Sequence, residues 1–203
     1  WQNKKIVREY PWKAEDIQSR EGMPSTISSR PLAFSKDGRY FAACRSANNG
    51  SDYYFVRIWD AQSGAVMKDI PAPQYDGNRF GCTALDFSPN SKILAVVADS
   101  GGRNKSGKLI PSYIVLLNAP DWTFKKNYAI DTGRFPLKVV SFDPSGRYVA
   151  GAYWLSNRRP KEYAGVDVRD NPAVVTVWDT ERDTEVASRI VYWALKGATG
   201  INL

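Results

Sequence analysis

Short apolar runs separated by polar turn residues extend along most of this chain. The runs over residues 39–44, 92–97 and 147–152 are rich in aromatic, β-branched and small apolar residues. Such runs, bounded by Gly, Pro, Asn and Ser, are typical of β-strands rather than of helices. The pattern therefore predicts an all-β protein.

One strand pair occurs three times in the sequence. Each copy has an apolar strand that ends in Phe, a polar turn, and a second apolar strand. The copies cover residues 31–44, 84–97 and 140–152. The anchor residues are Phe34, Phe87 and Phe142, with spacings of 53 and 55 residues. A fixed phase of this kind indicates a tandem repeat of one structural unit.

A third and a fourth strand follow each pair. The third strands are predicted over 54–60, 113–118 and 174–179, and the fourth over 65–70, 124–130 and 184–191. Two of the third strands end in a Trp-Asp pair, at Trp59-Asp60 and Trp178-Asp179. Four antiparallel strands per unit, repeated in tandem, are typical of the blades of a β-propeller.

The repeated motifs resemble those of the WD-repeat family. The resemblance rests on Phe-Ser-Lys-Asp-Gly-Arg-Tyr (34–40), Phe-Asp-Pro-Ser-Gly-Arg-Tyr (142–148), Val-Arg-Ile-Trp-Asp (56–60) and Val-Thr-Val-Trp-Asp (175–179). It implies a propeller of four-stranded blades and a scaffold that binds a protein or peptide. The family's Gly-His pair is missing, and long insertions join the second and third strands, so a divergent propeller is expected.

The repeat divides the chain into blades. Complete blades are predicted over 30–71, 80–130 and 135–192. Residues 1–11 are expected to form the outer strand of a preceding blade, 12–29 an inter-blade connection, and 198–203 the first strand of a following blade. Because closed propellers use about four to eight blades, we expect a longer propeller or closure by an associated chain.

Composition limits the chemistry that this segment can perform. The chain has 203 residues and a formal net charge of +7, with the basic residues spread among acidic ones. It contains no histidine, which excludes histidine-based zinc sites and a Ser-His-Asp triad built from these residues alone. No metal, cofactor or catalytic residue is predicted. The two cysteines, Cys44 and Cys82, lack a metal-site spacing and are expected to be small buried residues without a disulfide.

The candidate partner-binding residues lie in loops that the propeller geometry gathers on one face. Long loops on a rigid scaffold are common sites of function. Arg79-Phe80 and Arg134-Phe135 lie in the connections that lead into two successive blades, and each pair begins eight residues before the anchor Phe of its blade. Arg and aromatic residues are enriched at binding hot spots. The alternative is that both Phe side chains fill the gap between blades. Basic residues in two long insertions complete the set: Arg103, Lys105, Lys108, Arg158 and Arg159.

Three functions fit these observations. The first is a non-catalytic scaffold that binds a protein or peptide partner through its loop-rich face. The second is the propeller domain of a larger enzyme or periplasmic protein with catalytic residues outside this segment. The third, binding to nucleic acid or to an anionic surface, is supported only by the net charge and the basic loops. The compartment in which the protein works stays open.

Overall fold

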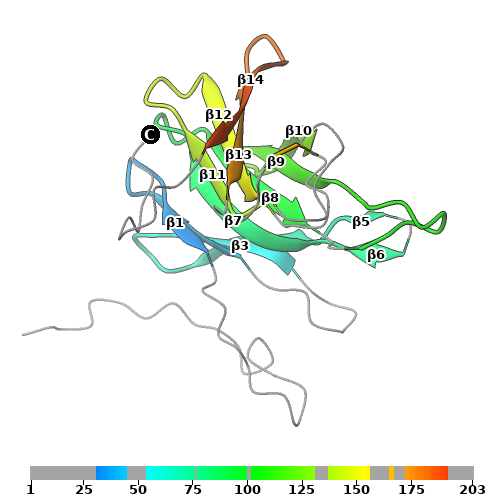
Figure 1. Cartoon of the computed structure of the whole chain (residues 1–203). Coiled ribbons are helices and arrows are strands. Elements are labelled where there is room, and N and C mark those ends of the chain that lie inside the picture. The colour runs from blue at the N-terminus through cyan, green and yellow to red at the C-terminus, as the bar shows by residue number, and fades with distance from the viewer. Residues whose placement is uncertain are drawn as a thin grey trace, which may run out of the picture.

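The described part of the chain consists of β-strands and their connections. The computed structural model describes residues 31–44, 54–75, 77–99, 102–130, 137–155, 165–166 and 172–191. Within these ranges there are three four-stranded antiparallel sheets and one short two-stranded hairpin (Figure 1). The same ranges contain no helix with the length and hydropathy needed to cross a membrane.

The three sheets follow one another along the chain, and we call them the first, second and third blades. The first contains β1 (Leu32–Phe34), β2 (Tyr40–Cys44), β3 (Tyr54–Asp60) and β4 (Val66–Pro71). The second contains β7 (Gly81–Phe87), β8 (Ile93–Asp99), β9 (Ser112–Asn118) and β10 (Thr123–Ile130). The third contains β11 (Val139–Phe142), β12 (Tyr148–Trp154), β13 (Ala173–Asp179) and β14 (Thr184–Val191). The small hairpin, β5 (Gln74–Tyr75) and β6 (Asn78–Arg79), joins the first blade to the second.

The blades are arranged as in part of a propeller. In each blade the strands pair in chain order, and β7 contacts both β1 and β11, so the first strands of the three blades are neighbours. The predicted fold class is confirmed, and the three sheets do not close into a ring. The strand predicted over 1–11, the connection over 12–29 and the strand predicted over 198–203 lie outside the described residues.

The same turn joins the first and second strands in every blade. In each copy of this turn, the fourth residue after the anchor Phe has a positive φ: 71° at Gly38, 59° at Ser91 and 74° at Gly146. Glycine reaches this left-handed region without a steric penalty, whereas Ser91 does so despite its side chain. The polar side chains inside each turn hold it closed through hydrogen bonds to the backbone. The side-chain acceptors are Ser35 and Asp37, Ser88 and Asn90, and Asp143 and Ser145.

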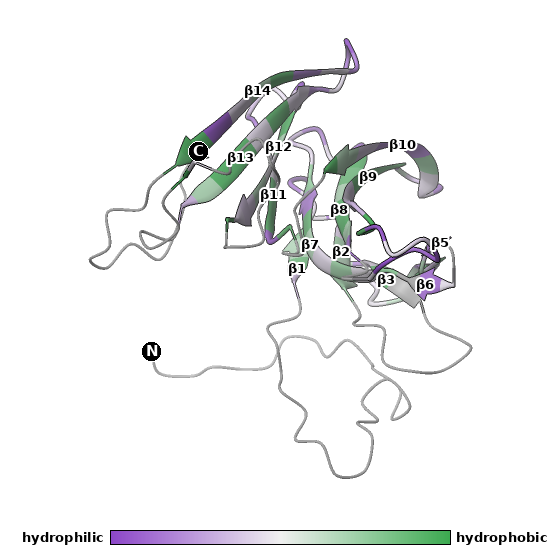
Figure 2. Cartoon of the chain, turned by 45° about the vertical axis from the view of Figure 1, so that its right-hand side comes forward, coloured by the Kyte–Doolittle hydropathy of each residue, from purple (hydrophilic) through white to green (hydrophobic). Residues whose placement is uncertain are grey.

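Both faces of the second blade are buried because its central strand alternates between two cores. Successive residues of a strand point to opposite sides of a sheet. Leu94, Val96 and Ala98 of β8 lie in a core shared with the first blade. Their neighbours along β8, Ile93, Ala95 and Val97, lie in a core shared with the third blade. Figure 2 shows that hydrophobic residues follow the strands and that hydrophilic ones gather at turns.

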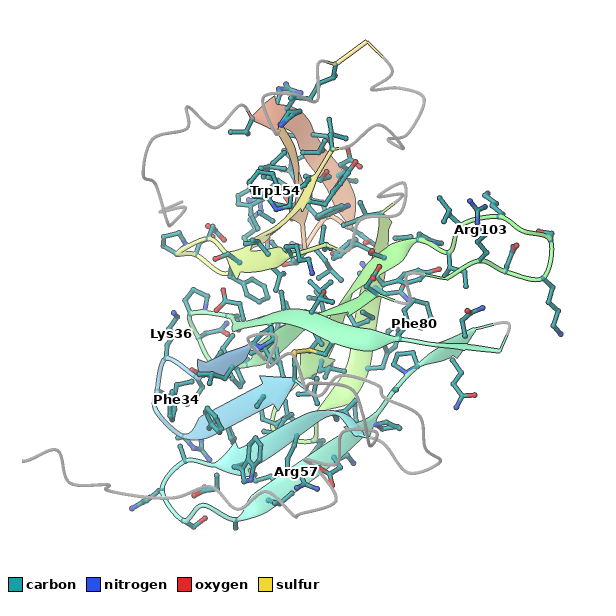
Figure 3. The ribbon with its side chains drawn as sticks, turned by 60° about the horizontal axis from the view of Figure 1, so that its bottom comes forward. Phe34, Lys36, Arg57, Phe80, Arg103 and Trp154 are labelled. Atoms are coloured by element: carbon teal, nitrogen blue, oxygen red, sulfur yellow. A yellow bond between two sulfur atoms is a disulfide. The ribbon has the colours of Figure 1, made fainter. Side chains whose placement is uncertain are left out.

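The first and third blades also carry apolar side chains on the faces turned away from the second blade. Leu32 and Phe34 of β1 are 61% and 51% exposed, and Trp154 of β12 is 42% exposed. Figure 3 shows Phe34 and Trp154 well apart, in the lower and the upper part of the view. The apolar character of the blades therefore does not stop at the two cores that the structure describes.

Polar contacts tie neighbouring blades together at fixed points. The Ser91 Oγ of the second blade accepts a hydrogen bond of 3.0 Å from the Asp37 backbone N–H of the first. The Asp86 carboxylate accepts a hydrogen bond of 2.9 Å from the Phe142 backbone N–H of the third blade. Because both acceptors belong to the second blade, it holds its two neighbours in register by directional bonds as well as by packing.

The expectation for the two cysteines is wrong in one respect. Both side chains are buried as predicted, but Cys44 at the end of β2 and Cys82 near the start of β7 form a disulfide between the first and second blades. Their Cα atoms are 5.3 Å apart although 38 residues separate them in sequence. Sequence spacing did not reveal this proximity because it arises only when the two blades pack.

Gly151 of β12 lies at a tightly packed point between the second and third blades. A Cβ atom at this position would lie 2.9 Å from Ile114 Cδ1 and 3.1 Å from Leu137 Cδ2. Both neighbouring side chains are fully buried. A side chain larger than hydrogen at this position therefore forces Ile114 and Leu137 to shift, and a large one overpacks the core between the two blades.

We predict that Gly151→Leu lowers the free energy of unfolding by about 1–3 kcal/mol through overpacking. Urea unfolding followed by tryptophan fluorescence measures this. The matched control is Gly165→Leu, because no heavy atom lies within 4 Å of a Cβ built there. Equal unfolding midpoints for the two variants would contradict the close contact at Gly151.

An ion pair closes the end of the third blade. The Arg147 guanidinium donates from Nε and Nη2 to Asp179 Oδ2, at 2.9 and 2.6 Å. The other carboxylate oxygen accepts from the backbone N–H groups of Glu181 and Arg182, both at 3.0 Å. The hydrogen bonds from Arg147 are the main cause that lowers the pKa of Asp179 to about 2, while burial opposes the shift.

The depressed pKa makes the stability of the third blade sensitive to acid. An unfolded Asp has a pKa of about 3.9, so the Asp179 contribution is complete above this value and is lost as the pH falls toward about 2. We predict that the wild-type urea midpoint falls between pH 4 and pH 2 and that Asp179→Asn falls less over the same range. Glu185→Gln, an exposed change on the same blade, should retain the wild-type dependence.

A candidate partner-binding groove between the first and second blades

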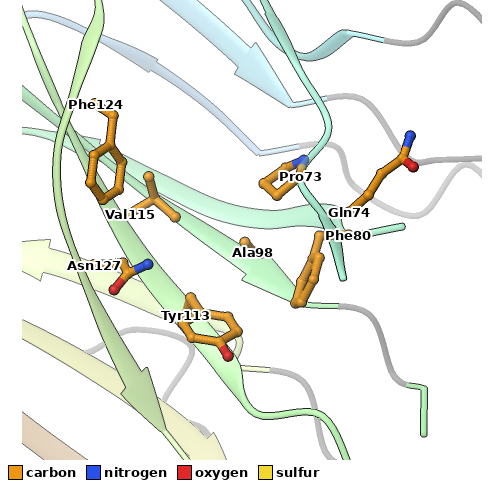
Figure 4. A pocket seen from close by; sticks show the side chains of 8 residues that line it. All are labelled: Pro73, Gln74, Phe80, Ala98, Tyr113, Val115, Phe124 and Asn127. Carbon is orange, nitrogen blue, oxygen red and sulfur yellow. The ribbon is translucent and has the colours of Figure 1, made fainter. Parts of the chain in front are cut away.

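A groove with a volume of about 290 Å³ lies between the connection that follows the first blade and the outer half of the second blade. Figure 4 shows Phe124 and Asn127 on one side of it, and Pro73, Gln74 and Phe80 on the other. We call this the inter-blade groove. The residues that line it are Pro73, Gln74, Phe80, Ala98, Tyr113, Val115, Phe124 and Asn127.

Strand register places the wall of the groove on the side of the second blade that faces the first. Directly opposed residues of neighbouring strands share a face of the sheet. Phe124 of β10 pairs with Leu117, and Asn127 pairs with Val115. Leu117 and Val115 both pack against the core between the first and second blades. A register shift between Phe124 and Lys126 lets both Phe124 and Asn127 lie on this face despite their odd spacing.

The two Phe side chains of the groove have different environments. Phe80 is only 3% exposed and its ring lies edge-on to Tyr113, with ring centroids 5.6 Å apart. Phe124 is 63% exposed. Phe80 is therefore part of the packed joint between the blades and forms the floor of the groove, whereas Phe124 presents an apolar ring to solvent.

The chemistry of the groove is apolar with a few uncharged polar groups. Among the described side chains that line it none is charged, and the polar ones are Gln74, Tyr113 and Asn127. Pockets that enclose a whole small molecule usually have volumes of about 300–1,000 Å³. A volume at the lower limit of that range fits one or two side chains of a protein or peptide.

A basic hairpin lies beside the groove. Residues 102–110 turn back on themselves, with Arg103 bridged to Leu109 and the Asn104 side chain accepting from the Lys108 backbone N–H at 2.8 Å. The Asn78 side-chain amide, on β6, donates to the Arg103 carbonyl at 3.0 Å. Since the small β5–β6 hairpin also carries Gln74, this bond fixes the basic hairpin next to the groove wall.

The basic hairpin is more ordered than the sequence indicates. A Gly-, Ser- and Lys-rich insertion is expected to be a flexible loop, but backbone bonds across the hairpin and the burial of Ile110 in the core hold this one. Arg103, Lys105 and Lys108 are exposed, and residues 102–110 contain no Asp or Glu. The Arg103 guanidinium donates to the Gly107 carbonyl of the same hairpin. The hairpin therefore carries a local positive charge beside an uncharged groove.

The structure brings some of the predicted site residues together. Phe80 lines the groove and fills the gap between blades, in agreement with the alternative given for it. Arg103, Lys105 and Lys108 share the neighbouring hairpin. Arg79 ends β6 beside Phe80, and the structure describes its backbone but not its side chain. The remaining predicted residues, Arg134, Phe135, Arg158 and Arg159, lie outside the described residues.

Several groove residues were missed by sequence reasoning. The position of Phe124 in the second blade corresponds to Val66 in the first blade and to Glu185 in the third. An alignment of the three repeats could have singled out Phe124, because it is the one aromatic residue among the three. The β5–β6 hairpin was also missed, although Asp76-Gly77 is a common hairpin turn. Asn127 and Gln74 carry no sequence signal, because only the register shift and the hairpin turn them toward the groove.

Comparison with known proteins supports the fold and leaves the family open. No protein-family model matches the chain, and no curated protein matches it. Among solved structures, the chain is similar to hydrazine synthase of Kuenenia stuttgartiensis, with 18% identity and a TM-score of 0.53 over 79% of this chain and 40% of that one. It also matches a eukaryotic initiation factor, with 16% identity and a TM-score of 0.49 over 79% of this chain and 31% of that one.

The chain spans less than half the length of these two structures. At 18% identity the similarity to hydrazine synthase concerns the fold alone. Together with the three four-stranded sheets, it places the described residues in a propeller-like fold.

The different burial of the two groove Phe side chains gives a direct test of their roles. We predict that Phe80→Ala lowers the free energy of unfolding by about 3–5 kcal/mol, the usual loss for a buried Phe. Phe124→Ala should change it by no more than about 0.5 kcal/mol, as an exposed position does. Urea unfolding of both variants measures this, and similar losses for both would show that Phe124 also belongs to the core.

Proposed function

We propose that this chain is a WD-repeat-like, non-catalytic scaffold that binds a protein or peptide partner at the inter-blade groove. The observation that carries the proposal is an exposed Phe124 ring over an uncharged groove, next to a hairpin with three exposed cations. Exposed apolar patches with polar rims mark interaction sites on protein surfaces. The partner places one apolar side chain in the groove and acidic groups against the basic hairpin.

The WD-repeat part of the proposal is supported by the turns between third and fourth strands. Asp60 of the Trp59-Asp60 pair accepts hydrogen bonds from the Gln62 and Ser63 backbone N–H groups. Asp179 of Trp178-Asp179 accepts the corresponding bonds in the third blade. The repeated motif therefore has one structural role, which is to close the outer turn of the blade.

The groove also fits a peptide backbone. Gln74 and Asn127 are amides that both donate and accept hydrogen bonds. Polar groups of this kind satisfy main-chain N–H and C=O groups without demanding a charge. In this arrangement the apolar floor provides most of the affinity, and the cations of the hairpin select acidic neighbours and speed association.

A phage-displayed library of random 12-residue peptides, selected on the immobilised chain, tests this function. We predict that the enriched peptides share one aromatic or large aliphatic residue flanked by Asp or Glu. A synthetic enriched peptide should bind Phe124→Ser about tenfold more weakly in fluorescence polarisation, the equivalent of about 1.4 kcal/mol. Val186→Ser, at a similarly exposed apolar position of the third blade, is the matched control and should bind as the wild type does.

Charge variants separate the contribution of the hairpin from that of the groove. Lys105→Glu with Lys108→Glu should weaken binding and reduce its dependence on salt. Lys36→Glu with Arg189→Glu makes the same change in net charge on the first and third blades, at two exposed positions, and should have little effect; Lys36 lies far from Arg103 in Figure 3. Peptides that bind the Phe124 variant and the hairpin variant as well as the wild type would refute the proposed site.

A further inference from the structure

The disulfide between Cys44 and Cys82 is a covalent joint between two blades. Cys44 is the last residue of β2 and Cys82 the second residue of β7, so the two strands belong to different sheets. Figure 3 shows the bonded sulfur atoms inside the described structure, between the ribbons of the first and second blades. The joint thus adds a covalent bond between two strands that also pack against the same core.

The geometry of the two blades supports the pairing. The 203-residue sequence contains two cysteines, Cys44 and Cys82, and the structure pairs them with each other. Their Cα separation of 5.3 Å lies within the usual range for disulfides, about 4.4–6.8 Å. Blade packing alone brings together two residues that are 38 positions apart. A matched pair of cysteines at such a joint is what a structural cross-link requires.

Burial makes the cross-link structural rather than a reactive redox centre. Cys44 is 1% exposed and Cys82 is 7% exposed, and both lie in the core between the first and second blades. Cysteines that act in redox catalysis are partly exposed, because an external thiolate has to reach the sulfur. The surroundings of this pair are apolar, with Ala42, Val56 and Leu85 in the same core.

The cross-link lies next to the inter-blade groove and stabilises the chain segment that forms part of it. Cys82 follows Phe80 by two residues, and Phe80 is the floor of the inter-blade groove. The Phe80 backbone N–H donates to the Pro73 carbonyl at 3.1 Å, which closes the connection between the two blades. The disulfide therefore fixes one end of this connection to β2 of the first blade.

We propose that Cys44 and Cys82 are a site of oxidative modification and that the chain matures in an oxidising compartment, outside the reducing cytosol. Disulfides form and persist in such compartments and are rare in the cytosol. The oxidant is a disulfide-bearing thiol oxidoreductase or a small-molecule disulfide. One S–S bond of the oxidant breaks and one forms between Cys44 and Cys82, and the two protons and two electrons lost by the thiols convert the oxidant to two thiols.

This inference is independent of partner binding, and its test reads the state of the cysteines directly. The chain is taken from cells that naturally produce it, quenched with acid, denatured and treated with an alkylating maleimide without reductant. We expect neither cysteine to be alkylated and a linked pair of Cys44 and Cys82 peptides to appear by mass spectrometry. Prior treatment with dithiothreitol should allow both to react. Alkylation of more than half of either cysteine without reductant would overturn the proposal.

A second measurement tests whether the cross-link supports the joint between blades. Dithiothreitol should lower the thermal midpoint of the oxidised wild-type chain by several degrees and increase hydrogen exchange in peptides that cover residues 78–87. The double variant Cys44→Ala with Cys82→Ala should show no response to dithiothreitol and should resemble the reduced wild type. A wild-type midpoint that dithiothreitol leaves unchanged, with complete reduction shown by mass spectrometry, would contradict a structural role.

Discussion

The burial of both faces of β8 is the constraint on which the remaining structure depends. A strand that sends alternate residues into two cores has to be covered by a sheet on each side. Leu94 and Val96 meet the first blade, while Ala95 and Val97 meet the third. Each blade is thus stabilised by packing against its neighbours as well as by contacts of its own, as is general for repeat proteins.

Directional contacts convert this packing into a fixed arrangement. Apolar faces alone tolerate small rotations of one sheet over another. The bond from Phe142 to Asp86 and the bond from Asp37 to Ser91 set the height of each blade relative to the next. The disulfide adds a third fixed point near the entry to the second blade. The inter-blade groove depends on this rigidity because its two walls belong to different parts of the chain.

Much of the fold was predictable because each blade repeats one local pattern. Strand periodicity, the turn after Phe34, Phe87 and Phe142, and the Trp-Asp positions are features of nearby residues. They predicted four antiparallel strands per unit, which the structure confirms.

The candidate site was less predictable. The Cys44–Cys82 disulfide, the register shift beside Phe124 and the approach of Asn78 to the basic hairpin are contacts between segments distant in sequence. Hydropathy patterns specify which face of a strand is buried, but they do not specify which residue of the next blade lies opposite.

The basic hairpin has a consequence for how this scaffold can change its specificity. Its ends are fixed by the bridge between Arg103 and Leu109 and by the burial of Ile110, so the tip residues contribute nothing to the register of β8 and β9. New tip sequences can replace the present one without a change in the blades. Natural or engineered changes in the tip sequence can therefore create new contacts with a partner while the blades stay the same.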